Sequence, residues 1–201
     1  MSNKQRRDFL KLVGCAAITA ATATPSLAFP DKVFRQSLPC GPTRSVAPTP
    51  PEPEIRRLAF HNLHTGEAID AVYWEKDSYV PDALSEVNHV LRDFRNGQVH
   101  AIDPRLLDLL HSLSSKLETR SPFHVISGYR SPQTNALLRE RSSGVAHSSL
   151  HMKGLAIDIR LADVDLSRLH QAALSLKGGG VGYYPESDFV HVDVGPVRRW
   201  G

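Results

Sequence analysis

The sequence is poor in cysteine, with only Cys15 and Cys40 among its 201 residues. A scaffold held together by several disulfides is therefore excluded. If the segment that carries Cys15 is removed, Cys40 remains as a single thiol, free or paired between molecules, and no internal disulfide can form. The chain is long enough for one domain with a sizeable apolar core, and that core must supply most of the stability.

The sequence also lacks a strong charge and a long apolar run. Its formal net charge is +3, but residues 1–28 hold four basic residues and one acidic residue, so 20 basic and 20 acidic side chains remain without them. The basicity thus gives no reason to expect a nucleic-acid or membrane-surface partner. The apolar stretch Leu12–Thr24 has 13 residues. At about 1.5 Å per residue it is too short for a bilayer core of roughly 30 Å, so no permanent membrane span is expected.

Residues 1–28 have the composition of an export signal. A charged start and a weakly apolar middle are followed by Pro25-Ser26-Leu27-Ala28. The run Arg6-Arg7-x-Phe9-Leu10-Lys11 resembles a twin-arginine-type signal, which predicts export to the periplasm and cleavage after Ala28. Residues 29–54 contain seven of the 14 prolines. Because proline favours extended, solvated backbone, this segment is predicted to be a tether.

From residue 55 the pattern becomes that of a folded domain, which we expect to cover 55–201. Apolar residues on both sides of a His64–Glu67 turn predict a hairpin over 58–73. Helical spacing, or a capping residue followed by proline, predicts helices over 81–94, 104–113, 132–141 and 166–176. Strands are expected at 123–127, 155–159, after 182 and at 189–194. Early helices and late strands favour an α+β fold, a small antiparallel sheet with helices packed on one side.

Two clusters carry the residues suited to chemistry. The first is His151-x-x-Gly154-x-Ala156-x-Asp158, and the second is the alternating strand that places His191 and Asp193 on one face. Imidazole nitrogen and carboxylate oxygen are ligands that zinc accepts, and three protein ligands leave a position for water. The two clusters together therefore indicate a zinc hydrolase. We expect the other histidines to be structural or exposed, including His147, which only lies near the first cluster in the sequence.

Three stretches, taken in order, resemble the zinc D,D-peptidase family. They are Ser127-Gly128-Tyr129-Arg130-Ser131-Pro132 with Asn135, then Ser149-x-His151-x-x-Gly154-x-Ala156-x-Asp158, then His191-x-Asp193. That family includes D-alanyl-D-alanine carboxypeptidases and murein endopeptidases, and it shares the hedgehog/DD-peptidase fold. Residues 179–185 and 189–200 resemble the exported murein endopeptidase K branch. The resemblance covers roughly residues 55–201.

The resemblance implies that His151, Asp158 and His191 hold zinc. It further implies that Arg130 holds a substrate carbonyl or carboxylate oxygen and that Ser149 forms a hydrogen bond with the substrate near the metal. A salt bridge across the loop is the alternative for Arg130, and a capping role is the alternative for Ser149.

The general base has two candidates. Several relatives place a carboxylate three residues before the last histidine, where this chain has Asp188. Residues three apart in a regular strand face opposite sides, so Asp188 can serve only if the chain bends before Phe189. Asp193 lies on the same face as His191, and could orient that imidazole or be the base itself.

The sequence therefore predicts an exported zinc metallopeptidase that hydrolyses peptide cross-links of peptidoglycan. One alternative is a D,D- or L,D-carboxypeptidase that trims stem peptides, and another is a non-catalytic wall-binding module. The expected partners are stem peptides and their cross-links. The particular bond and the oligomeric state do not follow from the sequence.

Overall fold

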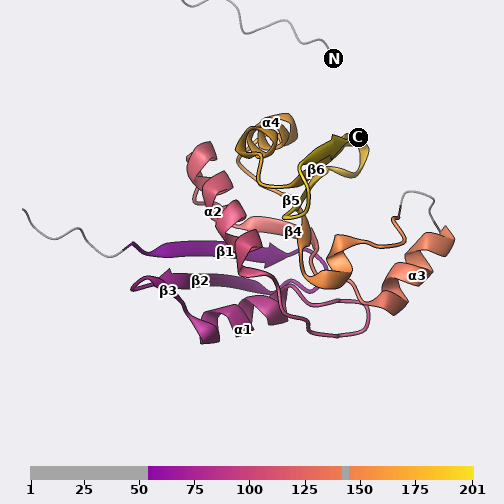
Figure 1. Cartoon of the computed structure of the whole chain (residues 1–201), viewed down its shortest axis with the longest axis horizontal. Coiled ribbons are helices and arrows are strands. Elements are labelled where there is room, and N and C mark those ends of the chain that lie inside the picture. The colour runs from indigo at the N-terminus through magenta and orange to yellow at the C-terminus, as the bar shows by residue number, and fades with distance from the viewer. Residues whose placement is uncertain (1–53, 142–144) are drawn as a thin grey trace, which may run out of the picture. The chain divides into compact units, whose positions relative to one another are not determined.

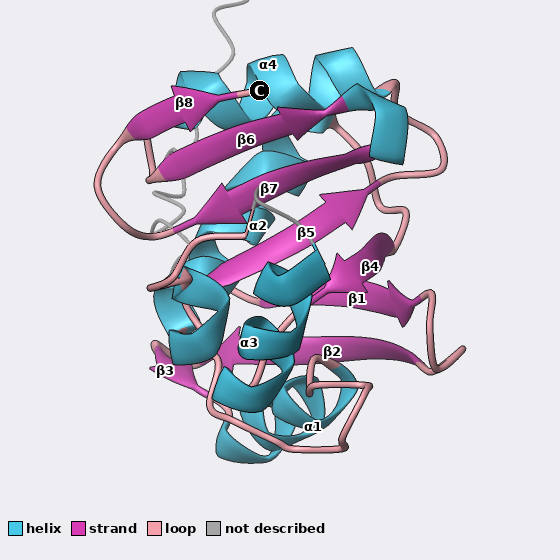
Figure 2. Ribbon diagram, turned by 90° about the vertical axis from the view of Figure 1, so that its right-hand side faces the viewer, coloured by secondary structure: helices cyan, strands magenta, loops and turns pink. Residues whose placement is uncertain are grey.

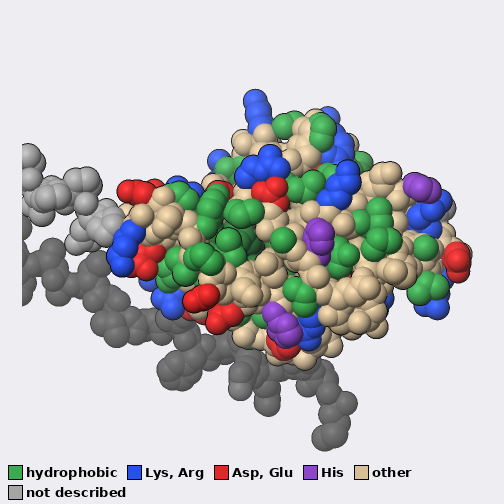
Figure 3. Space-filling model, turned by 60° about the horizontal axis from the view of Figure 1, so that its bottom comes forward, with side chains coloured by type: hydrophobic (Ala, Val, Ile, Leu, Met, Phe, Trp, Pro, Cys, Tyr) green, Lys and Arg blue, Asp and Glu red, His purple; other side chains and the backbone are tan. Residues whose placement is uncertain are grey.

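The computed structural model describes residues 54–141 and 145–201 (Figure 1). The predicted signal (1–28) and the tether (29–54), apart from its last residue, lie outside the described residues and stay predictions. Among the helices in the described part of the chain, none is both long and apolar enough to cross a membrane. On the face drawn in Figure 3, basic and acidic side chains are interspersed rather than gathered by sign, in keeping with the balanced charge of this region.

The domain is built on one eight-stranded sheet with the order β3-β2-β1-β4-β5-β7-β6-β8 (Figure 2). The strands are β1 (Arg56–Asn62), β2 (Ala68–Glu75), β3 (Ser78–Tyr79), β4 (Phe123–Ser127), β5 (Ala156–Arg160), β6 (Gly180–Tyr184), β7 (Phe189–Asp193) and β8 (Arg198–Trp200). The helices are α1 (Pro81–Val90), α2 (Pro104–Leu117), α3 (Pro132–Arg141) and α4 (Leu166–Leu176), with short 3-10 helices η1 (Leu150–Lys153) and η2 (Pro185–Ser187).

The predicted α+β fold is confirmed, but the sheet is eight-stranded and mixed rather than small and purely antiparallel. Most neighbouring strands are antiparallel, but β1 pairs with β4 and β6 pairs with β8 in parallel. Two strands joined by a tight hairpin are necessarily antiparallel, whereas β1 and β4 are separated by β2, β3 and two helices. Their parallel pairing depends on long-range packing, which the sequence pattern does not contain.

Two of the predicted helices, α2 and α3, begin at specific caps. Asp103 accepts a hydrogen bond from the backbone N–H of Arg105 at the start of α2, and the Ser131 hydroxyl accepts one from the backbone N–H of Thr134 in α3. The prediction that α1 continues to Phe94 is wrong, since α1 ends at Val90. The Asp93 carboxylate accepts the backbone N–H groups of Arg95 and Ser131, an arrangement that competes with a further helical turn.

One apolar core lies between the helices and the sheet. In α2 the buried positions recur at helical spacing, and in β5 and β7 alternate residues are fully buried. Helices α2 and α4 lie behind the sheet in Figure 2, whereas α3 lies in front of it. The largest buried side chains of the core are Phe60, Tyr73, Leu91, Leu106, Leu107, Leu110, Leu113, Phe123, Ile157, Ile159 and Leu169.

The opposite face of the sheet carries the polar side chains. Strand pairing places Ser127 beside Asp158, Asp158 beside His191, His191 beside Gly182, and Gly182 beside Trp200. These five residues form one row across five neighbouring strands, which we call the site row. Because side chains alternate between faces, the neighbours Ile157 and Val192 point into the core while the site row stays on the other face.

Candidate metal centre

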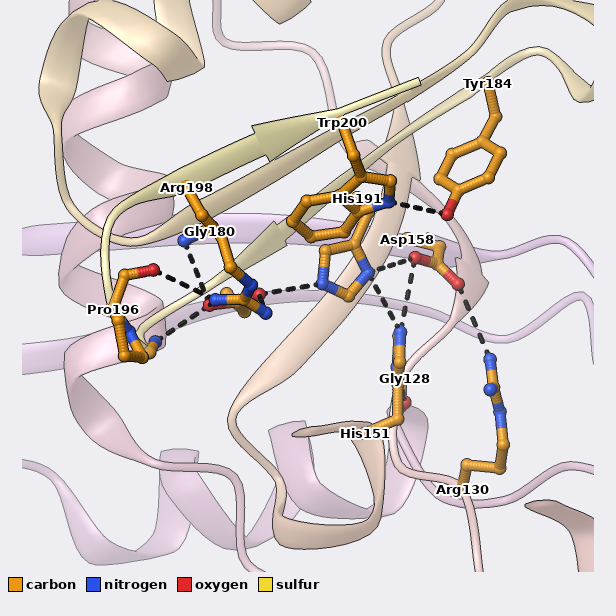
Figure 4. A network of polar contacts seen from close by, with 12 residues as sticks. Gly128, Arg130, His151, Asp158, Gly180, Tyr184, His191, Pro196, Arg198 and Trp200 are labelled. Carbon is orange, nitrogen blue, oxygen red and sulfur yellow. Dashed lines mark hydrogen bonds and ion pairs between the residues drawn. The ribbon is translucent and has the colours of Figure 1, made fainter. Parts of the chain in front are cut away.

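The three predicted ligand residues converge at one point of the site row. The His191 Nδ1 atom lies 2.8 Å from Asp158 Oδ1, and His151 Nε2 lies 3.3 Å from the same oxygen. The two imidazole nitrogens are 3.2 Å apart. All three side chains are buried, and they are the only group in the described part of the chain that could hold a metal ion through three such residues. Figure 4 shows them meeting from β5, β7 and the η1 loop.

His151 reaches this point from η1, whose position is fixed by the turn that ends it. Gly154 closes η1 with a φ of 66°, and a Cβ there would lie 2.1 Å from the backbone oxygen of Ala101. Only glycine fits both requirements. The His151 Nδ1 faces the backbone oxygen of Gly128 at 2.8 Å, and the His151 oxygen accepts the backbone N–H of Arg130. The histidine loop and the loop after β4 are therefore tied together.

His191 is oriented by Asp193, two residues further along the same face of β7. The Nε2 atom of His191 lies 3.0 Å from Asp193 Oδ2. The Asp193 carboxylate is fully buried and also accepts hydrogen bonds from the backbone N–H groups of Gly180 and Gly195 and from the Arg198 guanidinium. Burial by itself would raise the pKa of Asp193, but these hydrogen bonds together hold it well below its usual range. Asp193 therefore remains an anion.

The outer partner of each imidazole, the Gly128 oxygen for His151 and the Asp193 carboxylate for His191, only accepts hydrogen bonds, so Nδ1 of His151 and Nε2 of His191 are donors. The inner nitrogens both face Asp158 Oδ1, which also only accepts, so each needs either a proton or a cation between it and that oxygen. With a metal ion at the cluster, the protons stay on the outer nitrogens and each inner nitrogen offers a lone pair. Three electron-rich atoms facing one another repel unless a cation lies among them. The donor set therefore fits a bound divalent metal ion with nitrogen and oxygen ligands.

The pKa values of His191 and Asp158 also indicate that the cluster is stabilised by positive charge. Burial lowers the pKa of His191, but its hydrogen bonds to Asp158 and Asp193 outweigh this and raise it to about 9. Burial would raise the pKa of Asp158, yet its interactions with His151 and His191 hold it below its usual range. Without a metal, a proton on His191 would compensate for the buried carboxylates.

Arg130 lies beside the cluster. Its Nη2 atom is 3.7 Å from Asp158 Oδ2 and 3.4 Å from the Ser127 hydroxyl, both longer than a strong hydrogen bond. Its buried Nε has no hydrogen-bond partner within residues 54–141 and 145–201. The backbone around it is fixed, because Tyr129 donates its N–H to Leu91 and Ser131 donates its N–H to Asp93. A rigidly held guanidinium with unused donors is suited to a substrate oxygen.

The structure places the other predicted site residues at the edge of the cluster or away from it. Ser149 is buried immediately before η1, and its side chain makes no capping hydrogen bond. Asp188 is exposed and forms an ion pair with Arg160. The chain does bend before Phe189, through η2 and a left-handed backbone at Asp188 with a φ of 53°. His147 is exposed and outside the cluster.

Two aromatic residues beside the cluster, Tyr184 and Trp200, lie in the stretches that resemble the family but received no role from the sequence. Trp200 lies with its ring 5.1 Å from that of His191, and its Nε1 donates a hydrogen bond to the Tyr184 hydroxyl at 2.8 Å (Figure 4). A signal was available in Gly182, because a glycine opposite a ligand histidine leaves space above the sheet for a neighbouring ring. The parallel pairing of β8 that brings Trp200 there is not visible in the sequence.

Imidazole and carboxylate groups that could hold a metal ion, with a guanidinium beside them, are typical of a metallohydrolase, and this is the class to which the fold and the site point. Comparison with known proteins makes the assignment narrower. The chain belongs to the metallopeptidase family described as peptidoglycan L,D-endopeptidase MepK, whose model matches residues 51–200.

Similar curated proteins include the peptidoglycan L,D-endopeptidase MepK of Escherichia coli K12, which is 47% identical over 161 residues, or 78% of this chain and 88% of the relative. Another is the probable peptidoglycan L,D-endopeptidase MepK of Haemophilus influenzae, 44% identical over 149 residues, or 74% of this chain and 80% of the relative. No solved structure gives a significant match.

Proposed function

We propose that this protein is a zinc-dependent endopeptidase that hydrolyses peptide cross-links of peptidoglycan at a bond between an L- and a D-configured centre. The observation that carries the proposal is the convergence of His151, Asp158 and His191, whose inner imidazole nitrogens and carboxylate oxygen meet at one point while the outer nitrogens face the Gly128 oxygen and the Asp193 carboxylate. The family description and the names of the similar proteins support the substrate and the L,D specificity.

His151, Asp158 and His191 would hold the zinc ion. Bound zinc supplies a Lewis acid and lowers the pKa of its water toward about 7. The chain's own groups then act around the reacting carbonyl. Arg130 stabilises negative charge on the carbonyl oxygen through donors that are unused in the structure, and the Ser149 side chain forms a hydrogen bond with the peptide beside the metal.

We assign the general base to Asp188 and a positioning role to Asp193. The two oxygens of Asp193 already accept five hydrogen bonds from buried or ordered donors, so they have little capacity to take a proton from water. Asp188 is exposed, lies at the bend that leads into β7 and forms an ion pair with the half-buried Arg160, which follows Asp158 by two residues in β5. It can leave that ion pair at a small cost, since exposed ion pairs contribute about 0–1 kcal/mol.

The assignment of the base is tested by replacing Asp188 with asparagine, which keeps the shape and removes the basic oxygen. We expect kcat to fall about 100-fold or more with zinc content unchanged. Glu186→Gln is the matched control, because Glu186 is an exposed carboxylate in the same η2 turn. A fall of less than about threefold for Asp188→Asn would reject the assignment.

We further propose that residues 1–28 direct export to the periplasm, because their sequence resembles a twin-arginine-type signal. Cell fractionation tests this. Replacing Arg6 and Arg7 by lysines should leave the protein in the cytoplasm with its signal uncleaved, whereas unchanged export would contradict a twin-arginine route.

The function itself is tested with cross-linked muropeptide dimers and the zinc-loaded protein. We expect conversion of dimers to monomers, abolished by chelation and by His151→Ala. His147→Ala is the matched control, since His147 is an exposed histidine in the same loop. Product masses identify the bond. Loss of a single terminal alanine would indicate a carboxypeptidase, and wall binding without cleavage would indicate a binding module.

A further inference from the structure

Three half-buried aromatic rings lie on the site face next to the metal cluster. The register places Tyr184 opposite Phe189 and Gly182 opposite both His191 and Trp200. The rings of Tyr184 and Phe189 stack with centroids 4.5 Å apart, and the Trp200 ring lies 5.1 Å from His191. All three rings are partly open to solvent, so this aromatic side of the site can be reached by a bound peptide.

Trp200 is held in place by contacts with Gly182 and Arg198. A Cβ at Gly182 would lie 2.7 Å from the indole, so the ring rests directly on the glycine backbone. The Arg198 guanidinium, which also bonds to Asp193, lies 4.9 Å from the centre of the indole ring. Arg198 thus holds Asp193, the partner of His191, and also packs against Trp200, so the indole has little freedom to move.

The hydrogen bond between Trp200 and Tyr184 fixes how the Tyr184 hydroxyl is used. Indole Nε1 can only donate, so the hydroxyl oxygen is the acceptor of this 2.8 Å bond. The hydroxyl hydrogen must then point elsewhere, and within residues 54–141 and 145–201 it has no acceptor. The Tyr184 hydroxyl thus has its oxygen engaged by Trp200 and its hydrogen unpaired, on a half-buried face. It can therefore donate a hydrogen bond to a bound ligand.

We propose that Tyr184 is a substrate-binding residue that donates a hydrogen bond to a peptide carbonyl oxygen next to the scissile bond, and that Trp200 is the positioning residue that aims it. Tyr184 pairs with Phe189, two residues before His191 on the same face of β7, and its hydroxyl is joined to the Trp200 ring that lies beside His191. Its donor therefore meets the peptide beside the reacting carbonyl. The inference rests on the proposed peptidase function and adds to it how the peptide is held.

A bond to a neutral carbonyl beside the reaction centre is made equally in the ground state and the transition state, so its loss acts on KM. For Tyr184→Phe we expect KM for the muropeptide dimer to rise about 5- to 20-fold, with kcat within about threefold of the unmodified protein. Tyr183→Phe is the matched control, because Tyr183 is the neighbouring residue in β6 and stacks on His170 in α4. It should leave both constants unchanged.

Trp200→Phe keeps an aromatic ring and removes the Nε1 donor together with the part of the indole that packs on Gly182. Its KM should rise, but by less than the KM of Tyr184→Phe. The double variant Tyr184→Phe/Trp200→Phe should have a KM no higher than that of Tyr184→Phe alone. Fully additive effects would overturn the positioning role of Trp200.

The full chain, loaded with zinc and acting on muropeptide dimers, separates the possible failures. If the unmodified protein cleaves dimers but Tyr184→Phe keeps its KM within twofold, or loses kcat alone, the role of Tyr184 is wrong and the peptidase function stands. If the unmodified protein cleaves no dimers, the proposed peptidase function is wrong, and the role of Tyr184 is rejected with it. Zinc content and melting temperature equal to those of the unmodified protein show that Tyr184→Phe acts on binding rather than on folding.

Discussion

Replacing Asp193 by asparagine tests whether the metal centre depends on the tautomer of His191. The amide oxygen can take only one of the two carboxylate positions. At the Oδ1 position it keeps the hydrogen bonds from Gly180, Gly195 and one Arg198 nitrogen, which lie 3.0, 2.8 and 3.2 Å away. The amide NH₂ then occupies the Oδ2 position and faces two former donors, Arg198 Nη2 and His191 Nε2.

His191 can meet an NH₂ group only by moving its proton to Nδ1, the nitrogen that faces Asp158. The proton would then occupy the lone pair that the metal requires. Changes of this kind behind a metal ligand typically cost about 10- to 100-fold in metal affinity. Two charge-assisted hydrogen bonds are also lost. Discounting the partly exposed Arg198, we expect the free energy of unfolding to fall by about 2–3 kcal/mol.

Zinc affinity is measured by competition with a chromophoric chelator, and the tautomer by the ¹⁵N shifts of the imidazole in the metal-free protein above pH 9, where the His191 ring is neutral. Asp70→Asn is the control, since Asp70 is an exposed strand carboxylate paired only with the exposed Arg57. If Asp193→Asn binds zinc within threefold of the unmodified protein while His191 keeps its proton on Nε2, the argument from the tautomer is refuted.

Two further predictions concern stability. In the metal-free protein the raised pKa of His191 stabilises the fold fully below pH 6.5, and this contribution, at most about 3 kcal/mol, is lost as the pH rises through 9. Denaturant unfolding of chelated protein checks it, and stability that does not fall over this range would contradict it. Gly154→Ala should lower unfolding free energy by about 3 kcal/mol or more and weaken zinc binding, because its Cβ meets the Ala101 backbone. Gly66→Ala, with a similar φ of 73° but open space, should cost only about 1 kcal/mol and leave zinc binding intact.

Much of the fold follows from local patterns in the sequence. The hairpin, the caps of α2 and α3 and the alternation in β7 are decided by residues near one another in the chain, and all of them appear in the structure. The order of the strands is not local. The parallel pairing of β1 with β4 and of β6 with β8 arises from packing between distant segments, and the sequence gives no sign of it.

In the candidate site, too, some residues can be identified from the sequence and others only from the folded chain. His151, Asp158 and His191 were found because two spaced clusters of ligand residue types occur together, and the structure brings these side chains to one point. Asp193 was placed correctly on the face of His191 by strand alternation, but the donors that saturate it come from Gly180, Gly195 and Arg198, which only the folded chain gathers. The role of the aromatic neighbours was missed because Tyr184 and Trp200 meet only through the pairing of β6 with β8, which has no local mark in the sequence.

The site row limits where the length of the chain can vary. Each of its members lies on a different strand, and side chains alternate in direction along every strand. Inserting or deleting a single residue within β5 or β7 would turn Asp158 or His191 toward the apolar core, so such changes should eliminate zinc binding altogether. The same change within residues 145–149 or 185–187 leaves the strands in register. Natural length polymorphism, and any attempt to graft a new specificity, should therefore be confined to those connections.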